Sequence, residues 1–489
     1  MRLAWLVVAT LAAVACRPAW ATETDAYGEE LFSRLPLSVS GAFSFEDATA
    51  LRTSEVGESI RSWMTEQDAL AETRRAWELL SKRLGVSGVE AFDGLLGGNT
   101  VIAFDQRDGE ERIDWIVLAA VDTAMDVRLL QRTRAVPRKL AYGRAVLGLE
   151  EESFLLATLP PLRDGRSVVA LAPAGAEWLL VRTLAVSAGK AEPVDADALR
   201  AAPTDAVVRG YWEPSGAMGL FGDIEAWFWG PTERMQRVAV WARTDAASIE
   251  IGLRPTDGNK VEELEPTAPA EGVLLDVVGP GTAIVSSVLE RAGLTGLVPE
   301  GLLVTRRTGE LVVRRGPDGI DLGARLPLQE PVAHAVGMVE PPMGEAGQVR
   351  VRSLSETRSS RAIFGPKPQL AWTLLTKDPG RAKLLVAVTA GPVRSVDEDQ
   401  TTKSTAVHIV GQAIDRPSPK TPGVHGAARP HEIWGLLNAI SPPDEASREA
   451  SAGIASVLAL LDQASWAVEV ESGAVGGRIV LELREAAAR

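Results

Sequence analysis

Two of the four histidines lie close together and suggest a metal site. His425 lies six residues before His431, which is followed directly by Glu432. Histidines that bind one metal ion from a helix are three or four residues apart, whereas these two are six apart in a Pro-containing segment. The spacing therefore favours surface-loop histidines over metal ligands. His334 and His408 lie in strand-like runs, where packing or edge positions are expected.

Serine and phosphate chemistry have weak support. Ser187 and Lys190 fit a Ser-x-x-Lys pattern, but they lie among small residues, and a catalytic pair needs a helix that brings both side chains onto one face. No Gly-x-Ser-x-Gly nucleophile motif occurs. Residues 279–282 (Gly-Pro-Gly-Thr) lack the third glycine of a dinucleotide motif and the Gly-Lys-Ser/Thr ending of a P-loop. We predict no catalytic residue and no cofactor.

Short charged clusters occur along the chain. Asp195 with Asp197, and residues 397–399, are acidic but lack the ligand spacing of a calcium loop. We interpret them as solvated surface, with a weak calcium site as the open alternative. Arginines at 350, 352, 358 and 361 indicate an exposed strand and loop. The formal net charge of −14 argues against nucleic-acid binding, because a phosphate backbone attracts clustered Lys and Arg.

Tryptophan is unusually frequent, with 13 residues against three tyrosines. Four lie close in sequence: Trp212, Trp227, Trp229 and Trp241. Exposed rings could stack on sugars, whereas packing would bury on the order of 200 Å² for each ring. On a helix, Trp227 and Trp229 would be about 200° apart and could not share a face; on a strand they would. The neighbouring apolar spacing is helical, so we predict core packing for most of these rings and no flat platform, with Trp227 and Trp229 as the candidate ligand contacts.

The N-terminus has the pattern of an export signal. Arg2 precedes an uncharged apolar run of 13 residues, and residues 19–21 (Ala-Trp-Ala) match a cleavage site. We predict a signal peptide over 1–21, which places the mature protein in the periplasm or outside the cell. Cys16, the single cysteine, lies inside this segment, so cleavage after residue 21 would leave no thiol. The alternative is a lipid anchor on Cys16. No later run is long and apolar enough to span a bilayer, so the mature chain is not expected to be transmembrane.

Small, polar or Pro-rich stretches divide the remaining chain. They lie at 187–204 and around 327–345, and a Pro/Gly-rich stretch at 411–431 predicts a surface loop. We therefore predict three α+β units: 22–190, 204–326 and 345–489.

Three segments alternate apolar and polar residues around a short turn, as hairpins do. They are 237–254, 302–326 and 465–484. Helical periodicity precedes at least two of them. The sequence thus predicts an α+β fold of antiparallel sheets built from repeated helix-hairpin units and covered by helices. True duplication and ordinary α+β packing stay open as explanations.

The last hairpin allows a prediction about its faces. Neighbouring residues of a strand point to opposite sides of the sheet. Val468 and Leu481 should then face the core, and Glu469 and Glu482 the solvent.

Residues 76–105, AWELLSKRLGVSGVEAFDGLLGGNTVIAFD, and the hairpin end GRIVLEL at 477–483 resemble a broad group of secreted bacterial proteins that are described only as a domain of unknown function. In that group a helix, a Leu-Gly stop, a short acidic helix and a Leu-Gly-Gly turn lead into an apolar strand. The resemblance implies an exported α+β protein, and it supplies no catalytic residues.

These observations predict a non-enzymatic envelope protein that binds or scaffolds an unidentified partner, without nucleic acid. Two alternatives stay open. One is a carbohydrate-binding or carbohydrate-acting protein, which would use the tryptophans and carboxylates. The other is a hydrolase whose active site is assembled from distant segments and leaves no local motif.

Overall fold

The three-dimensional structure is a computed structural model of the 489-residue chain. It describes residues 25–45, 81–106, 113–122, 125, 136–149, 154–213, 237–256, 265–280, 308–327, 350–353, 361–375, 383–389, 398–399, 406–414, 423–433 and 461–484, with short interruptions at 83, 96, 204, 245–247, 317–318, 362–364, 368, 410–411 and 472–473. Within these residues, no helix has the length and apolar character needed to cross a membrane.

Strands dominate the described residues, and the helices are short. The helices are α2 (Asp25–Phe32), α6 (Gly88–Leu95), α8 (Glu177–Ser187) and α9 (Asp197–Ala201), with a 3-10 turn η2 (Ala174–Ala176). The strands of the first half are β1 (Gly41–Phe45), β2 (Thr100–Gln106), β3 (Ile113–Val121), β4 (Val136–Ala141), β5 (Arg144–Leu149), β6 (Phe154–Leu159), β7 (Ser167–Pro173), β8 (Val208–Trp212), β9 (Val238–Thr244) and β10 (Ser248–Pro255). Those of the second half are β11 (Val273–Pro280), β12 (Thr308–Arg315), β13 (Ile320–Pro327), β14 (Arg350–Ser353), β15 (Gln369–Leu375), β16 (Lys383–Thr389), β17 (Glu398–Asp399), β18 (Ala406–Ile409), β19 (Gln412–Ile414), β20 (Gly423–Ala428), β21 (Leu461–Glu471) and β22 (Ala474–Leu483).

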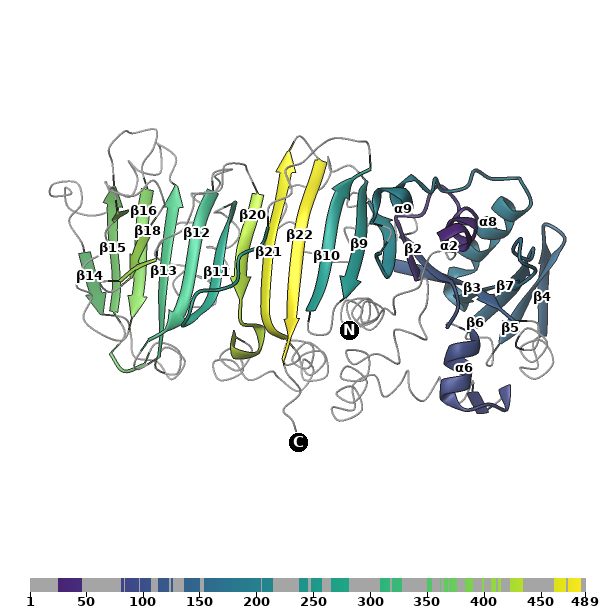
Figure 1. The fold of residues 1–489 in the computed structure, drawn as a ribbon, viewed down its shortest axis with the longest axis horizontal. Coiled ribbons are helices and arrows are strands. Elements are labelled where there is room, and N and C mark those ends of the chain that lie inside the picture. The colour runs from purple at the N-terminus through teal and green to yellow at the C-terminus, as the bar shows by residue number, and fades with distance from the viewer. Residues whose placement is uncertain are drawn as a thin grey trace.

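Nineteen of these strands form one sheet. Their pairings are all antiparallel and give the order β4-β5-β6-β7-β3-β2-β1-β8-β9-β10-β22-β21-β20-β11-β12-β13-β16-β15-β14. Figure 1 shows the sheet running along the length of the molecule, from β14 at one end to β4 at the other. Strands β17–β19 form a separate three-stranded sheet.

The strand order of the large sheet repeats. Outward from the β10–β22 pairing, the first half runs β10-β9-β8-β1-β2-β3-β7-β6-β5, and the second runs β22-β21-β20-β11-β12-β13-β16-β15-β14. When the nine strands of each series are ranked by their order in the chain, the two series give the same sequence of ranks. The sheet is therefore built from two nine-stranded units of identical topology, and β4 is the one strand of the large sheet without a counterpart.

A close approach of two strands recurs at the same place in both units. A Cβ at Gly210 in β8 would lie 2.0 Å from the carbonyl oxygen of Ala42, and one at Gly426 in β20 would lie 2.3 Å from that of Asp276. Only glycine fits at such distances from a neighbouring backbone. Gly210 and Gly426 therefore hold equivalent positions, and aligning them shows which residues of the two units correspond.

The two units meet at equivalent strands. The cross-strand rows next to the two glycines run Arg209–Trp241–Gly252 in the first unit and His425–Ala467–Arg478 in the second. Gly252 and Arg478 thus hold equivalent positions, and they lie directly opposite each other across the β10–β22 pairing. Equivalent strands that pair antiparallel about such a point are related by a two-fold axis. We call this β10–β22 pairing the seam.

Three glycines of the sheet lie under aromatic rings. Gly252 is opposite Trp241, Gly426 is opposite Trp466, and Gly41 is opposite Phe104. A Cβ would come within 1.9 Å, 2.6 Å and 2.1 Å of the respective ring atoms. Each ring covers a strand position that lacks a side chain, which both fills the space and protects the backbone.

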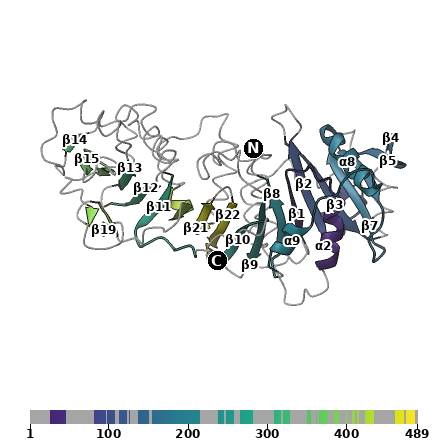
Figure 2. The same cartoon turned by 90° about the horizontal axis from the view of Figure 1, so that it is seen from above.

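The first unit has a three-layered core. On one face of its sheet, α2 and α8 pack on β2 and β3 in a cluster of buried residues that includes Leu31, Phe32, Leu180, Val101 and Ile116. On the opposite face, Ala91 of α6 packs with residues of β3, β6 and β7. Figure 2 shows α2, α8 and α9 gathered at the end of the molecule that holds β1–β8.

The predicted α+β fold is wrong. The described residues form a predominantly antiparallel β structure, in which the hairpins belong to one continuous sheet. The three predicted hairpins are confirmed as β9–β10, β12–β13 and β21–β22. Their predicted upstream helices lie outside the described residues. The repeat of the strand order divides the chain between β10 and β11. The predicted division into 22–190, 204–326 and 345–489 concerns units that fold independently. Strand pairing does not test it, so it stays a prediction.

The predicted loop at 411–431 is also corrected. It contains β19 and β20, and β20 is an interior strand between β11 and β21. Its sequence, GVHGAA, has the small residues of a loop because Trp466 and the neighbouring strand occupy the space that larger side chains would need. Val424, Ala427 and Ala428 are buried there.

The face prediction for β21–β22 holds only in part. Val468 is buried as expected, but Glu469 is buried too, and Leu481 and Glu482 are both partly buried. Strand β21 lies inside the sheet with buried residues on both of its faces, including Ser465. The prediction assumed a solvated face, which an interior strand covered on both sides does not have.

Candidate functional site

Several residues singled out from the sequence lie outside the described residues. They are Cys16, Trp227, Trp229 and His334, together with residues 1–21. The lipid-anchor and ligand-contact hypotheses therefore stay predictions.

Ser187 and Lys190 lie at the C-terminal end of α8. Ser187 is the last residue of α8, and the amide N–H groups of Gly189 and Lys190 donate to the carbonyls of Val186 (2.9 Å) and Ala185 (2.8 Å). This is a Schellman motif, and Gly189 has the positive φ of 67° that it requires. Lys190 lies past the helix end, so no turn of helix brings it beside the Ser187 hydroxyl. The Ser-x-x-Lys pattern is explained by helix termination.

Three of the four histidines lie in described elements. His425 lies in β20 and His431 in a short helical turn, where Glu432 pairs with Arg315 at 2.5 Å. His408 lies in β18, in agreement with the predicted strand. Among the described residues, no group of three or more His, Cys, Asp or Glu side chains could hold a metal ion.

The acidic clusters and the arginines have structural positions. The Asp195 carboxylate accepts the amide N–H of Asp197 (3.0 Å), the first residue of α9, and Asp197 pairs with Arg200 (2.6 Å). Residues 398–399 form β17, and Arg350 begins the predicted strand as β14. Trp212 and Trp241 are buried, as the packing interpretation predicts.

The most concentrated polar site lies on the face of the first unit's sheet that α2 and α8 cover. Asp105 in β2 is directly opposite Asp114 in β3, so both carboxylates project from the same face. Ser40 Oγ donates to Asp105 (2.8 Å), and Trp178 Nε1 of α8 donates to Asp114 (2.6 Å). Two neighbouring carboxyl groups can act as the general acid and the general base of a catalysed reaction.

Tyr211 borders this pair. Its hydroxyl donates to the carbonyl of Val39 (2.8 Å), and the Arg237 guanidinium lies 4.3 Å from its ring centroid and pairs with Glu213 (3.3 Å). Burial is the main cause that raises the pKa of the Tyr211 phenol; Arg237 opposes the shift, and Glu213 and Asp105 add to it. The phenol therefore stays protonated and acts as a hydrogen-bond donor.

Burial decides what the carboxylate pair can do. Asp105 is 6% exposed and Asp114 is 2% exposed, so a substrate cannot reach them. The second unit has Arg314 and Asp321 opposite each other at the corresponding positions, paired at 3.3 Å. A buried aspartate at the same place in both units, with a different neighbour in each, indicates that it stabilises the fold.

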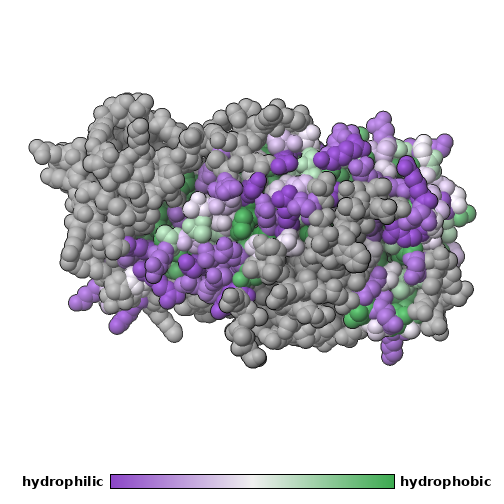
Figure 3. Space-filling model, in the orientation of Figure 1, coloured by the Kyte–Doolittle hydropathy of each residue, from purple (hydrophilic) through white to green (hydrophobic). Residues whose placement is uncertain are grey.

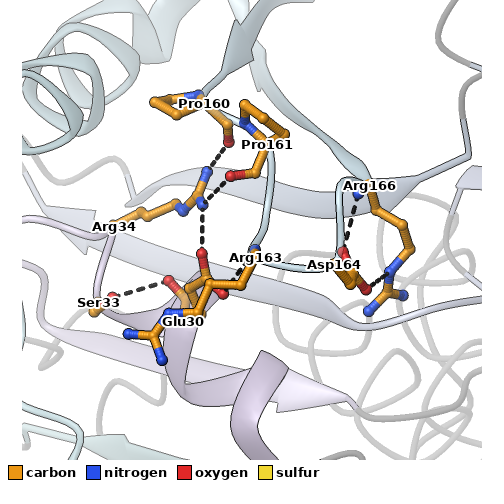
Figure 4. A network of polar contacts seen from close by, with 8 residues as sticks. All are labelled: Glu30, Ser33, Arg34, Pro160, Pro161, Arg163, Asp164 and Arg166. Carbon is orange, nitrogen blue, oxygen red and sulfur yellow. Dashed lines mark hydrogen bonds and ion pairs between the residues drawn. The ribbon is translucent and has the colours of Figure 1, made fainter.

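A second polar network fixes α2 to the loop between β6 and β7 (Figure 4). Arg34 donates to the carbonyls of Pro160 and Pro161 and pairs with Glu30 at 3.1 Å. Burial lowers the pKa of the Arg34 guanidinium, and Glu30 opposes this shift. Glu30 also accepts the amide N–H of Arg163 (3.3 Å). The network holds a helix against a loop and leaves no reactive group open.

In the same loop, Arg166 donates to Asp164 from its amide (2.9 Å) and its side chain (2.5 Å). Desolvation opposes ionisation of Asp164, but these hydrogen bonds outweigh it and hold the pKa of that carboxyl below its usual value. The loop is therefore locked by an ion pair at moderate and high pH.

The hairpin β4–β5 is the surface feature that the sequence interpretation missed. Val136, Leu140 and Tyr142 are 60%, 78% and 50% exposed. A signal was present, because residues 127–149 contain six Arg or Lys and no Asp or Glu in a chain of net charge −14. Exposed apolar side chains beside cations favour contact with another surface.

Comparison with known proteins adds no functional assignment: no family model, no curated protein and no solved structure matches the chain.

Proposed function

We propose that the protein is an exported component of the bacterial cell envelope that binds or scaffolds other components and has no catalytic activity. The observation that carries this proposal is the duplicated sheet of 19 strands. An extended sheet with fixed strand pairings is suited to presenting surfaces at a set separation. The candidate chemical groups support the same view, because Asp105, Asp114 and Tyr211 are buried and hydrogen-bonded within the fold.

The export part is tested by expressing the full chain in a Gram-negative host and measuring the intact mass of each cell fraction. We expect the periplasmic or secreted chain to begin at Thr22. A diacylated Cys16 would instead identify a lipoprotein, which keeps the envelope location. An intact chain starting at Met1 in the cytoplasm would overturn the proposal.

The binding part is tested by incubating the purified chain with isolated cell envelopes and sedimenting them at increasing protein concentration. Saturable co-sedimentation supports a binding role. Sedimentation that rises linearly without saturation would contradict it.

A further inference from the structure

The segment around β4 and β5 differs in charge from the rest of the chain. Over 127–149 the sequence carries arginines at 128, 132, 134, 138 and 144 and a lysine at 139, without an acidic residue. The whole chain has 65 acidic and 51 basic residues. In sequence this segment is therefore a cationic stretch of an acidic chain, and three of its cations, Arg138, Lys139 and Arg144, lie in β4 and β5.

The same hairpin holds most of the large apolar side chains that the described residues expose. Five such side chains are exposed, and Val136, Leu140 and Tyr142 are three of them. Leu140 and Tyr142 lie at the tip, where Tyr142 and Gly143 have positive φ values of 52° and 78°. Positive φ at both central residues is what a two-residue hairpin turn of type I′ requires, so the turn explains the backbone, while the tyrosine at its first position leaves an exposed ring at the tip.

The hairpin forms the free end of the sheet. Among the described strands β4 pairs with β5 alone, and residues 136–140 are all exposed. Figure 3 shows hydrophilic and hydrophobic side chains side by side at this end of the molecule. Within the part of the chain that the structure describes, β4 has no counterpart in the second unit, so the topology shared by the described strands does not require it.

The cations of the described hairpin have partners within the fold. Glu177 at the start of α8 pairs with both Arg138 (3.7 Å) and Lys139, so one carboxylate faces two cations. Arg144 donates to the carbonyl of Thr158 (2.8 Å), a neutral partner. The described hairpin thus carries three cations. Lys139 and Arg144 share the face of the buried Ala141 and Val146, whereas the exposed Leu140 lies on the opposite face.

The edge of β4 is poorly suited to receiving another strand. Pro137 has no amide N–H, and the pairing with β5 shifts register between Pro137 and Lys139. A proline, a bulge and cations are features that block strand addition at a sheet edge. A hairpin that has cations on one face, an exposed leucine on the other and a tyrosine at its turn can instead meet an anionic lipid surface with its tip, where the cations reach headgroups and the apolar groups enter the interface.

We propose that the β4–β5 hairpin docks the protein onto membranes that contain anionic phospholipid. Leu140 and Tyr142 would enter the headgroup region, while Arg138, Lys139 and Arg144 contact the phosphates. This inference rests on the proposed envelope location and specifies the surface that the protein meets there.

The experiment is co-sedimentation of the purified chain with vesicles of phosphatidylcholine alone and of phosphatidylcholine mixed with phosphatidylglycerol. We expect binding to the mixed vesicles only, weakening as salt is added. The double variant Leu140→Ser, Tyr142→Ser should lower the partition coefficient by about tenfold, because it removes the groups that enter the interface. Val89→Ser is the matched control, since Val89 is 47% exposed on α6, and it should bind like the wild type.

Circular dichroism and thermal unfolding check that each variant is folded, and Leu140→Ala is a milder second variant that should show a smaller loss. Equal binding to both vesicle types would overturn the proposal. So would a double variant that binds as well as Val89→Ser, or capture by an anionic polysaccharide in place of vesicles. Failure here would leave the export measurement unaffected, so the two proposals can be judged separately.

Discussion

Gly252, on the strand of the first unit that forms the seam, offers a sharp test of how an aromatic ring packs over a glycine of the sheet. Gly252→Ala would place a Cβ 1.9 Å from two ring atoms of Trp241, much closer than van der Waals contact allows. The ring cannot easily move, because Trp241 is buried against Ala202 and Ala206, and Arg243 lies 5.0 Å from its centroid. Overpacking of this kind costs about 1–3 kcal/mol. We expect Gly252→Ala to lower the free energy of unfolding by about 2 kcal/mol.

The assay is urea unfolding of four proteins: wild type, Gly252→Ala, Trp241→Ala and the double variant. Once the ring is removed, the alanine at 252 has room and gains up to about 1 kcal/mol over glycine within a strand. The double-mutant cycle should therefore give a coupling energy of about 2–3 kcal/mol between the two positions. If Gly252→Ala costs the same free energy with and without the ring, the proposed steric cause is refuted.

Three further predictions concern the polar groups and the tryptophans. Tyr211→Phe should cost about 1 kcal/mol through the lost hydrogen bond to Val39. Because the pKa of Tyr211 is raised in the folded state, its contribution is complete below about pH 10 and is lost as the pH rises further; the variant should lack this part of the alkaline stability loss, as measured by urea unfolding across pH. Arg314→Met should cost about 3 kcal/mol in the same assay by leaving the buried Asp321 carboxylate without its cation, and Asp321→Leu in that background should restore stability. Peptidoglycan and polysaccharide fragments should leave the tryptophan fluorescence unchanged, whereas a saturable shift abolished by Trp229→Ala would favour sugar recognition.

Local patterns in the sequence predicted the hairpins and missed how they assemble. The alternation over 465–484 specifies two strands because the turn and both partners are adjacent in the chain. The duplication is hidden because equivalent positions carry different residues, such as Trp241 against Ala467 and Gly252 against Arg478. What the units share is the pairing of backbones, which constrains residue type only where strands approach closely.

The polar site around Asp105 and Asp114 was likewise predictable only in its local part. The register of β2 and β3 places Asp105 opposite Asp114, and a hairpin prediction could have shown that. Their partners could not be predicted, since Ser40 and Trp178 are each more than 60 residues away in sequence. The cationic hairpin was detectable from the absence of acids over 127–149, but its exposure depends on β4 being the last strand of the sheet.

The seam explains how so long a sheet can exist. Twisted open sheets rarely exceed about ten strands, and each unit alone falls within that limit. At the seam Ile251 lies opposite Ile479 within an apolar face, and Glu250 pairs with Arg478 at 3.4 Å on the other face. Two ordinary sheets are thus joined through equivalent strands, as two subunits are in a symmetric dimer. Such a duplication produces a nearly symmetric scaffold, so a difference between the halves points to a specialised role. Within the large sheet that difference is β4, the strand that carries the exposed leucine and its neighbouring cations.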